Sequence, residues 1–115
     1  MYEYKCFTVR VVDCNTVDAE IDLGFNVLVR QRIKLFGIDV PNIKSNDESE
    51  KSRATQARNR LTELLGKEFI CQTIMNKRGK AGRILGHVYV IDANGQKLNI
   101  NDMLIEEGFA TKFGD

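Results

Sequence analysis

Residues 4–38 contain three strand-like segments joined by short polar turns, and this arrangement restricts the fold more than any other feature of the sequence. Residues 16–22 alternate strictly between apolar and acidic side chains, which is the period of a half-buried strand. A run rich in β-branched residues precedes this segment over 4–13, and a longer alternating segment follows over 27–38. Consecutive strands with short connections favour an antiparallel meander.

A helix is predicted after Pro41, a residue that ends both strands and helices. Four apolar residues recur at helical spacing: Ala54, Ala57, Leu61 and Leu64. With the capping-box spacing of residues 45–48 and a glycine at position 66, they predict a helix over 46–65. The remaining elements are then predicted in this order: a strand over 68–74, a basic loop over 76–82, a strand over 83–91, a hairpin turn over 92–95 and a short helix over 101–107.

This element order is that of a five-stranded oligonucleotide/oligosaccharide-binding (OB-fold) β-barrel of the α+β class. The long helix is inserted between strands three and four, and the short helix is C-terminal. The chain has 115 residues, which is the size of one domain, so a single domain over 1–115 is expected. Such barrels commonly bind nucleic acid on one face and its loops, although the fold alone specifies no chemistry.

Composition excludes several classes of function. The net charge is +1, so a nucleic-acid partner has to depend on a local basic cluster. One histidine and three widely spaced cysteines leave no zinc motif. Free thiols, an acidic N-terminal segment without a signal sequence, and the lack of a long apolar run favour a cytoplasmic protein with no membrane partner.

Positive charge is concentrated at two places on the barrel. One cluster consists of Lys77, Arg78, Lys80 and Arg83, interleaved with glycines and with no acid between them. Glycines allow backbone to approach a phosphate and arginine offers a planar fork to its oxygens, but a solvated hairpin tip is the simpler reading. Lys34 extends a second basic face on the third strand, where a solvated strand surface is the simpler reading.

Two acidic positions at strand ends are candidate metal ligands. Asp13 and Asn15 lie in the first turn, and Asp39 follows the third strand together with the Val40 carbonyl and Asn42. Hard oxygen donors of this kind suit Ca²⁺ or Mg²⁺ rather than zinc or copper. The alternative is that Asp13 and Asn15 only form hydrogen bonds to the backbone of a turn.

Four ordered segments of the sequence resemble the staphylococcal nuclease (thermonuclease) family. The segments are residues 11–18, 31–42, 82–90 and 98–110. The match runs in order over about residues 4–112, and the short, single-domain bacterial and phage members are the most similar, so a phage or prophage origin is an open interpretation. Active members are Ca²⁺-dependent phosphodiesterases that cleave DNA and RNA.

The resemblance assigns roles to individual residues. It implies that Asn15, Asp39 and the Val40 carbonyl bind calcium, with Asp13 outside the direct ligands. It also places Lys34 and Arg83 at the two phosphate-binding arginine positions and Asn42 at the position of the general base. Lys80 matches the lysine of the preceding loop, and Lys77 and Arg78 are expected to add to nucleic-acid binding.

Three of these positions depart from the family pattern, which has Asp at 15, Arg at 34 and Glu at 42. Asn15 removes a charge from a calcium ligand, and calcium affinity depends on the charge of the ligands. Lys34 cannot bind two phosphate oxygens as arginine does. Asn42 has no basicity, although a positioned base usually contributes about 10²–10⁴-fold to the rate.

Three functions remain open. The first is a nucleic-acid-binding nuclease homologue, a pseudoenzyme with weak or lost hydrolysis, whose partner is DNA or RNA and preferably single-stranded. The second is an active Ca²⁺-dependent nuclease with a rearranged site, in which Asp13 binds metal directly, Arg32 supplements the clamp, and a carboxylate from residues 47–50 replaces the base. The third is a barrel that binds a protein partner instead.

Overall fold

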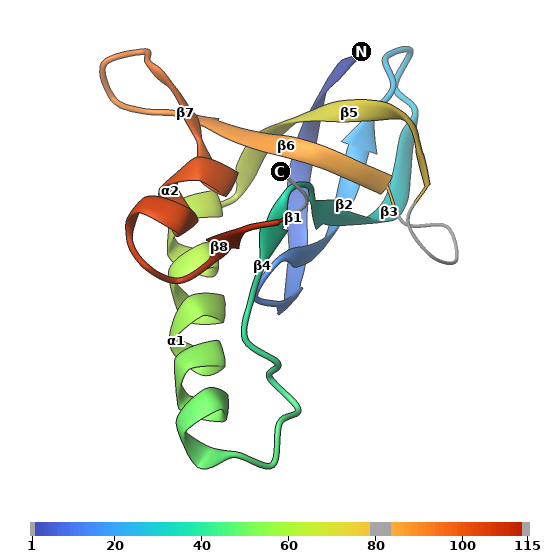
Figure 1. The fold of residues 1–115 in the computed structure, drawn as a ribbon. Coiled ribbons are helices and arrows are strands. Elements are labelled where there is room, and N and C mark those ends of the chain that lie inside the picture. Colours follow the sequence, from blue (N-terminus) through green and yellow to red (C-terminus); the bar gives the residue numbers. More distant parts are fainter. Residues whose placement is uncertain (1, 79–83, 114–115) are drawn as a thin grey trace.

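Five strands close into a β-barrel in the computed structural model, which describes residues 2–78 and 84–113 (Figure 1). The strands are β1 (Glu3–Asp13), β2 (Thr16–Asp22), β3 (Leu28–Leu35), β5 (Glu68–Arg78) and β6 (Ile84–Ile91). Neighbours pair in the order β3-β2-β1-β5-β6, all antiparallel, and a parallel β3–β6 pairing closes the barrel. The predicted OB-type barrel with an inserted helix is therefore confirmed.

The third strand is shorter than the sequence predicts. β3 ends at Leu35, and a separate two-residue strand, β4 (Ile38–Asp39), pairs with β8 (Thr111–Lys112) near the C-terminus. Gly37 separates the two strands with a φ of 80°, a conformation that glycine adopts without steric cost. Apolar residues and a glycine continue from Leu35 to Ile38 with no polar turn residue between them, so the sequence alone did not reveal that the chain leaves the barrel sheet here.

The inserted helix α1 (Glu48–Leu65) begins two positions later than predicted. Its N-cap is Asp47, whose carboxylate accepts from the Ser49 amide at 3.0 Å. Ser45, expected to be the cap of a capping box, instead accepts from the Asp47 amide at 3.0 Å. Gly66 ends the helix with a φ of 59°, as predicted.

The core lies between the barrel strands and the two helices. Its largest fully buried side chains are Ile33, Leu35, Leu61, Leu65, Ile100, Leu104, Val17 and Val88. All three cysteines are buried and free. Burial raises the thiol pKa to about 11 at Cys6 and Cys14 and to about 12 at Cys71. The thiols therefore act as small core groups, as the sequence reading expected for Cys6 and Cys71.

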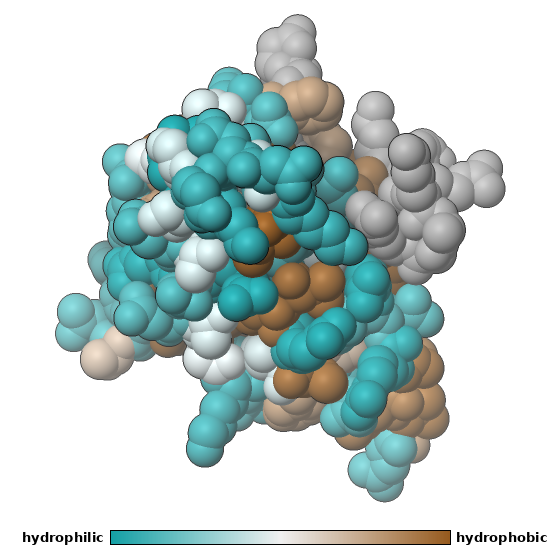
Figure 2. Space-filling view, turned by 90° about the horizontal axis from the view of Figure 1, so that it is seen from below, coloured by the Kyte–Doolittle hydropathy of each residue, from teal (hydrophilic) through white to brown (hydrophobic). Residues whose placement is uncertain are grey.

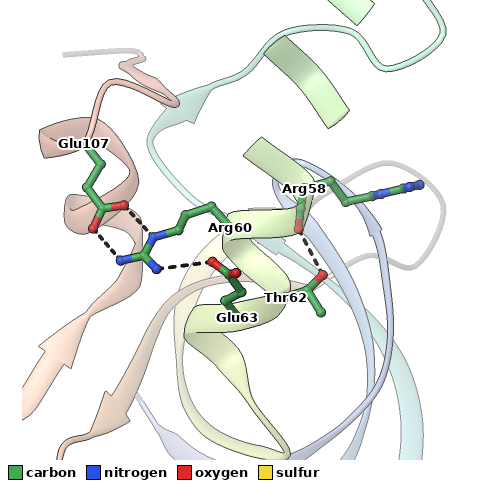
Figure 3. A network of polar contacts seen from close by, with 5 residues as sticks. All are labelled: Arg58, Arg60, Thr62, Glu63 and Glu107. Atoms are coloured by element: carbon green, nitrogen blue, oxygen red, sulfur yellow. Dashed lines mark hydrogen bonds and ion pairs between the residues drawn. The ribbon is translucent and has the colours of Figure 1, made fainter. Parts of the chain in front are cut away.

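A short hairpin and a second helix complete the fold. β7 (Lys97–Asn99) pairs with β6, and α2 (Ile100–Glu106) follows directly, with Asn99 as its N-cap. Arg60 of α1 binds the two carboxylate oxygens of Glu107 at 2.6 and 2.9 Å and Glu63 at 3.3 Å (Figure 3). This contact ties α1 to the end of α2.

The two helices lie on the same side of the barrel (Figure 1). Seen from below, hydrophilic side chains cover most of the surface and hydrophobic side chains gather near its centre (Figure 2). Among the residues that the structure describes, neither helix is long and apolar enough to span a membrane.

Candidate functional site

Three of the predicted site residues line one hollow of about 350 Å³, which we call the Lys34 groove. Asn15 comes from the β1–β2 turn, Lys34 from β3, and Asp39 from β4. The other lining residues are mainly apolar: Leu35, Phe36, Gly37, Ile38, Leu85 and Phe113. The β4–β8 pairing places Phe113 beside the groove, because the Phe113 amide donates to the Gly37 carbonyl at 2.9 Å.

Asn15 is 8% exposed and is held in the turn by several hydrogen bonds. Its amide donates to Asp13 Oδ1 at 3.1 Å, and its side-chain oxygen accepts from the Thr16 hydroxyl at 3.1 Å. Its carbonyl accepts from the Leu35 amide at 2.8 Å. Asp13 thus accepts the backbone hydrogen bond that the simpler sequence reading describes, whereas the Asn15 side chain contacts a neighbouring hydroxyl.

Cys14 connects this turn to the helix and to the segment after β4. The residue is fully buried, and its thiol donates to the Ala54 carbonyl of α1 at 3.1 Å. The Pro41 carbonyl lies 3.6 Å from the same sulfur. The Cys14 side chain therefore packs between the β1–β2 turn, α1 and the segment after β4.

Lys34 and Arg32 have different surroundings although they share one face of β3. Arg32 binds both carboxylate oxygens of Asp18 at 2.8 and 3.1 Å, and this contact lowers the Asp18 pKa. Lys34 pairs in register with the uncharged Thr16. Among the described residues, Lys34 forms no ion pair. Lys34 is thus the cation available to a ligand, while Arg32 is neutralised by its partner.

Asp39 lies between the Lys34 groove and a second hollow of about 410 Å³ against α1. Val40 lines this second hollow and not the Lys34 groove, together with Arg53 and Phe109. No local signal in the sequence distinguishes Arg53 from its neighbours on α1, because it shares this hollow with Asp39 only through tertiary packing.

Asn42 is used in the structure of the loop before α1. Its side-chain oxygen accepts from the Lys44 backbone amide at 2.9 Å, and the Asn42 backbone amide donates to Glu50 Oε2 at 3.0 Å. The second contact is the main reason why the Glu50 pKa lies below its usual value. In the described part of the chain, Asn42 is not among the residues that line either hollow.

Only part of the basic cluster lies within the described residues. Lys80 and Arg83 lie outside the described residues, and only the backbone of Lys77 and Arg78 is described, at the end of β5. Ile84, the first described residue after the cluster, pairs with Ile33 in β3.

The donor set of the Lys34 groove matches a calcium site in chemistry but not in charge. Asp39 and Asn15 supply a carboxylate and an amide oxygen, which are hard donors of the type that Ca²⁺ prefers. Only one formal negative charge is present between them. The described residues contain no group of three or more His, Cys, Asp or Glu side chains suited to a metal.

The five-stranded barrel with its inserted helix is of the OB-fold class, and the Lys34 groove places a lysine, an aspartate and an asparagine at its strand ends. A family model described as staphylococcal nuclease homologue matches residues 32–114. The chain therefore belongs to the staphylococcal nuclease homologue family, as the four sequence segments predicted. A search of curated proteins found no match.

Proposed function

We propose that this domain binds single-stranded DNA or RNA and has weak or no phosphodiesterase activity. The observation that supports this most strongly is the Lys34 groove, in which an ammonium without an ionic partner in the described chain lies beside a single carboxylate. A groove of this kind attracts a phosphate more readily than it holds a doubly charged metal ion. Nucleic-acid binding fits the family, and loss of hydrolysis fits the three altered positions.

Phosphate binding follows from the position of Lys34. Lys34 lines a groove whose other walls are mainly apolar, and it pairs in register with Thr16 instead of an acid. In the sequence, residues 77–83 carry four further basic residues. Lysine and arginine contacts to phosphates make binding strongly dependent on salt, because counterions are released. We therefore propose that affinity falls steeply as salt is added.

Weak hydrolysis follows from the residues at positions 15 and 42. A unit charge 4 Å from another is worth about 4 kcal/mol at an effective dielectric of 20, so replacing a carboxylate by Asn15 weakens calcium binding substantially. Asn42 has no basic atom, and its side-chain oxygen already accepts from the Lys44 amide. This site therefore has a weakened affinity for calcium and no base at the position where the family has one.

A second candidate function, an active nuclease with a rearranged site, is favoured by Glu50. Its carboxylate lies 3.0 Å from the Asn42 amide, so a carboxylate is present next to the position where the family has its base. The lowered pKa keeps Glu50 ionised at neutral pH but also makes it a weaker proton acceptor. Glu50 is the only one of the three replacement acids predicted from sequence for which a contact with Asn42 supports the role.

Fluorescence anisotropy with labelled single-stranded DNA and RNA tests the binding proposal. We expect binding at low salt that weakens steeply with added salt and is reduced by Lys34→Ala, while Lys51→Ala on the exposed face of α1 has little effect. Absence of binding below millimolar concentration at low salt would refute the proposal.

A cleavage assay with fluorogenic DNA and RNA separates the two candidates. We expect little or no metal-dependent cleavage by the natural chain when Ca²⁺ or Mg²⁺ is compared with chelator. The variant Asn15→Asp, Lys34→Arg, Asn42→Glu is expected to regain it. Cleavage by the natural chain that disappears in both Asp39→Ala and Glu50→Gln would instead establish the rearranged nuclease.

A further inference from the structure

A third hollow of about 380 Å³ adjoins the Lys34 groove, and we call it the α2 groove. The two grooves share Phe36, Gly37, Ile38 and Phe113. The residues that line only the α2 groove are His87, Asn101, Asp102, Ile105, Glu106 and Lys112. Its volume lies within the range of about 300–1,000 Å³ that is typical of small-ligand pockets.

Aromatic rings form the wall between the two grooves. Phe113 is 64% exposed, yet its backbone is fixed by the hydrogen bond from its amide to the Gly37 carbonyl. The Phe36 and His87 rings meet edge to face, with centroids 5.7 Å apart and an interplanar angle of 73°. An exposed aromatic ring on a positioned backbone is well suited to stack against a flat heterocycle.

The polar side chains of the α2 groove are not committed to one another. Asp102 and Glu106 lie one turn apart on α2 and are both exposed. Within the described residues, neither of them nor Lys112 takes part in an ion pair. His87 Nδ1 is buried without a hydrogen-bond partner in the same part of the chain. Buried polar atoms are normally paired, so the unpaired His87 Nδ1 is an exception within the described residues. No hydrogen bond at this nitrogen fixes the imidazole.

The charge of the α2 groove distinguishes it from the Lys34 groove. Two carboxylates and one ammonium give it a net negative charge, so it disfavours a phosphate. The same carboxylates can accept hydrogen bonds from exocyclic amino groups, and Asp and Glu pair in this way with the amino group of cytosine. The adjoining Lys34 groove offers a cation to the phosphate of the same strand.

We propose that the α2 groove receives one nucleobase of the bound strand, stacked on Phe113, and prefers a base with an exocyclic amino group. This inference rests on the proposed function, because it takes the phosphate of that strand to lie in the Lys34 groove. Cytosine and adenine donate from their amino groups to Asp102 or Glu106. At the position of the cytosine amino group, thymine and uracil carry a carbonyl oxygen, which the carboxylates repel.

Anisotropy titrations with two labelled oligonucleotides of equal length, one all cytosine and one all thymine, test this preference at pH 7.5. We expect the natural chain to bind the cytosine strand about 3–10-fold more tightly, somewhat less than a good bidentate contact provides. The double variant Asp102→Asn, Glu106→Gln is expected to bind both strands more tightly and equally well. Glu63→Gln, a carboxylate on α1 that contacts Arg60, should keep the preference.

Phe113→Ala is expected to weaken binding of both strands at least fivefold, as loss of one base–aromatic stack does. Phe25→Ala is the matched control, since Phe25 is 98% exposed on the β2–β3 turn and lines neither groove. Thermal unfolding of each variant confirms that it is folded.

As a phosphate-free readout, 2′-deoxycytidine should shift the NMR signals of His87 and Ile105, and thymidine should not.

The outcomes distinguish the two proposals. Salt-dependent binding with equal affinity for both strands, or shifts from both nucleosides, would overturn the α2 groove as an amino-base site and leave the proposed function intact. Absence of salt-dependent binding to either strand would overturn the proposed function. A cytosine preference that survives the double carboxylate variant would also overturn the inference.

Discussion

Asn101 is the buried polar side chain whose replacement tests the structure most directly. It is 2% exposed and connects α2 to the barrel. Its side-chain oxygen accepts from the Val88 amide at 3.1 Å, and its side-chain nitrogen donates to the carbonyls of Phe36 at 2.8 Å and Gly86 at 3.3 Å. Phe36 lies in the wall between the two grooves, so Asn101 positions both the helix and the site.

Asn101→Leu keeps the approximate volume and removes all three hydrogen bonds. The Gly86 carbonyl retains the Phe36 amide as a donor at 2.9 Å, so one amide and one carbonyl lose their partner. Each buried unsatisfied group costs about 1–3 kcal/mol, so we expect the two groups together to lower the free energy of unfolding by about 2–6 kcal/mol. That is a large part of the roughly 5–15 kcal/mol that stabilises a domain.

Asn101→Asp adds a pH dependence with a defined sign. The new carboxylate still accepts from Val88, but its second oxygen faces the two carbonyls and cannot donate unless it is protonated. Burial and these carbonyls raise its pKa in the folded state above that in the unfolded chain. The variant should therefore be closest in stability to the natural chain in acid and lose stability as the pH rises. The total loss is about 1.4 kcal/mol for each unit by which the pKa in the folded state exceeds that in the unfolded chain.

Urea unfolding followed by circular dichroism at pH 4.5 and 7.5 measures both effects. Asn59→Asp, an exposed position on α1, controls for the added charge and should show no such pH dependence. A cost below about 0.5 kcal/mol for Asn101→Leu would refute the hydrogen-bond assignment. An equal cost of Asn101→Asp at both pH values would refute the placement of its nitrogen between two carbonyls.

Three further predictions concern packing, an ion pair and a helix cap. A Cβ at Gly86 would lie 2.6 Å from Cys71 Sγ, so Gly86→Ala should lower the free energy of urea unfolding by about 1–3 kcal/mol. Adding Cys71→Ala should recover part of this loss, and strictly additive effects of the two substitutions would contradict the predicted contact. Arg60 lowers the Glu107 pKa, so the melting-temperature gap between the natural chain and Glu107→Gln should be present at neutral pH and close as the pH falls through the lowered pKa. Asp47→Ala should cost about 1 kcal/mol, and an unchanged midpoint in urea unfolding would argue against this cap.

Local sequence patterns predicted most of the fold because they reflect contacts between residues close in the chain. The alternation of residues 16–22 matches β2, and the apolar spacing that ends at Gly66 matches the end of α1. The boundary between β3 and β4 was missed, since it depends on a pairing with β8 that the local pattern does not contain. β5 likewise continues to Arg78, beyond the predicted end at residue 74.

The candidate site was predictable where its residues lie at strand ends and not where distant segments meet. Asn15, Lys34 and Asp39 come together in one groove, as expected for residues at neighbouring strand ends of a barrel. Phe113 and the contact of Glu50 with Asn42 were missed. Their positions result from β4–β8 pairing and from the packing of the loop before α1, neither of which leaves a periodic signal.

Two of the three altered family positions carry side chains that form hydrogen bonds within the chain. The Asn15 side chain accepts from the Thr16 hydroxyl, and the Asn42 side chain accepts from the Lys44 amide. Lys34, the third, takes part in no ion pair among the described residues. Restoring one family residue leaves the other two departures in place and does not complete the catalytic set. Because groups that act as a unit are not additive, single reversions should remain inactive and only the combined variant should gain activity.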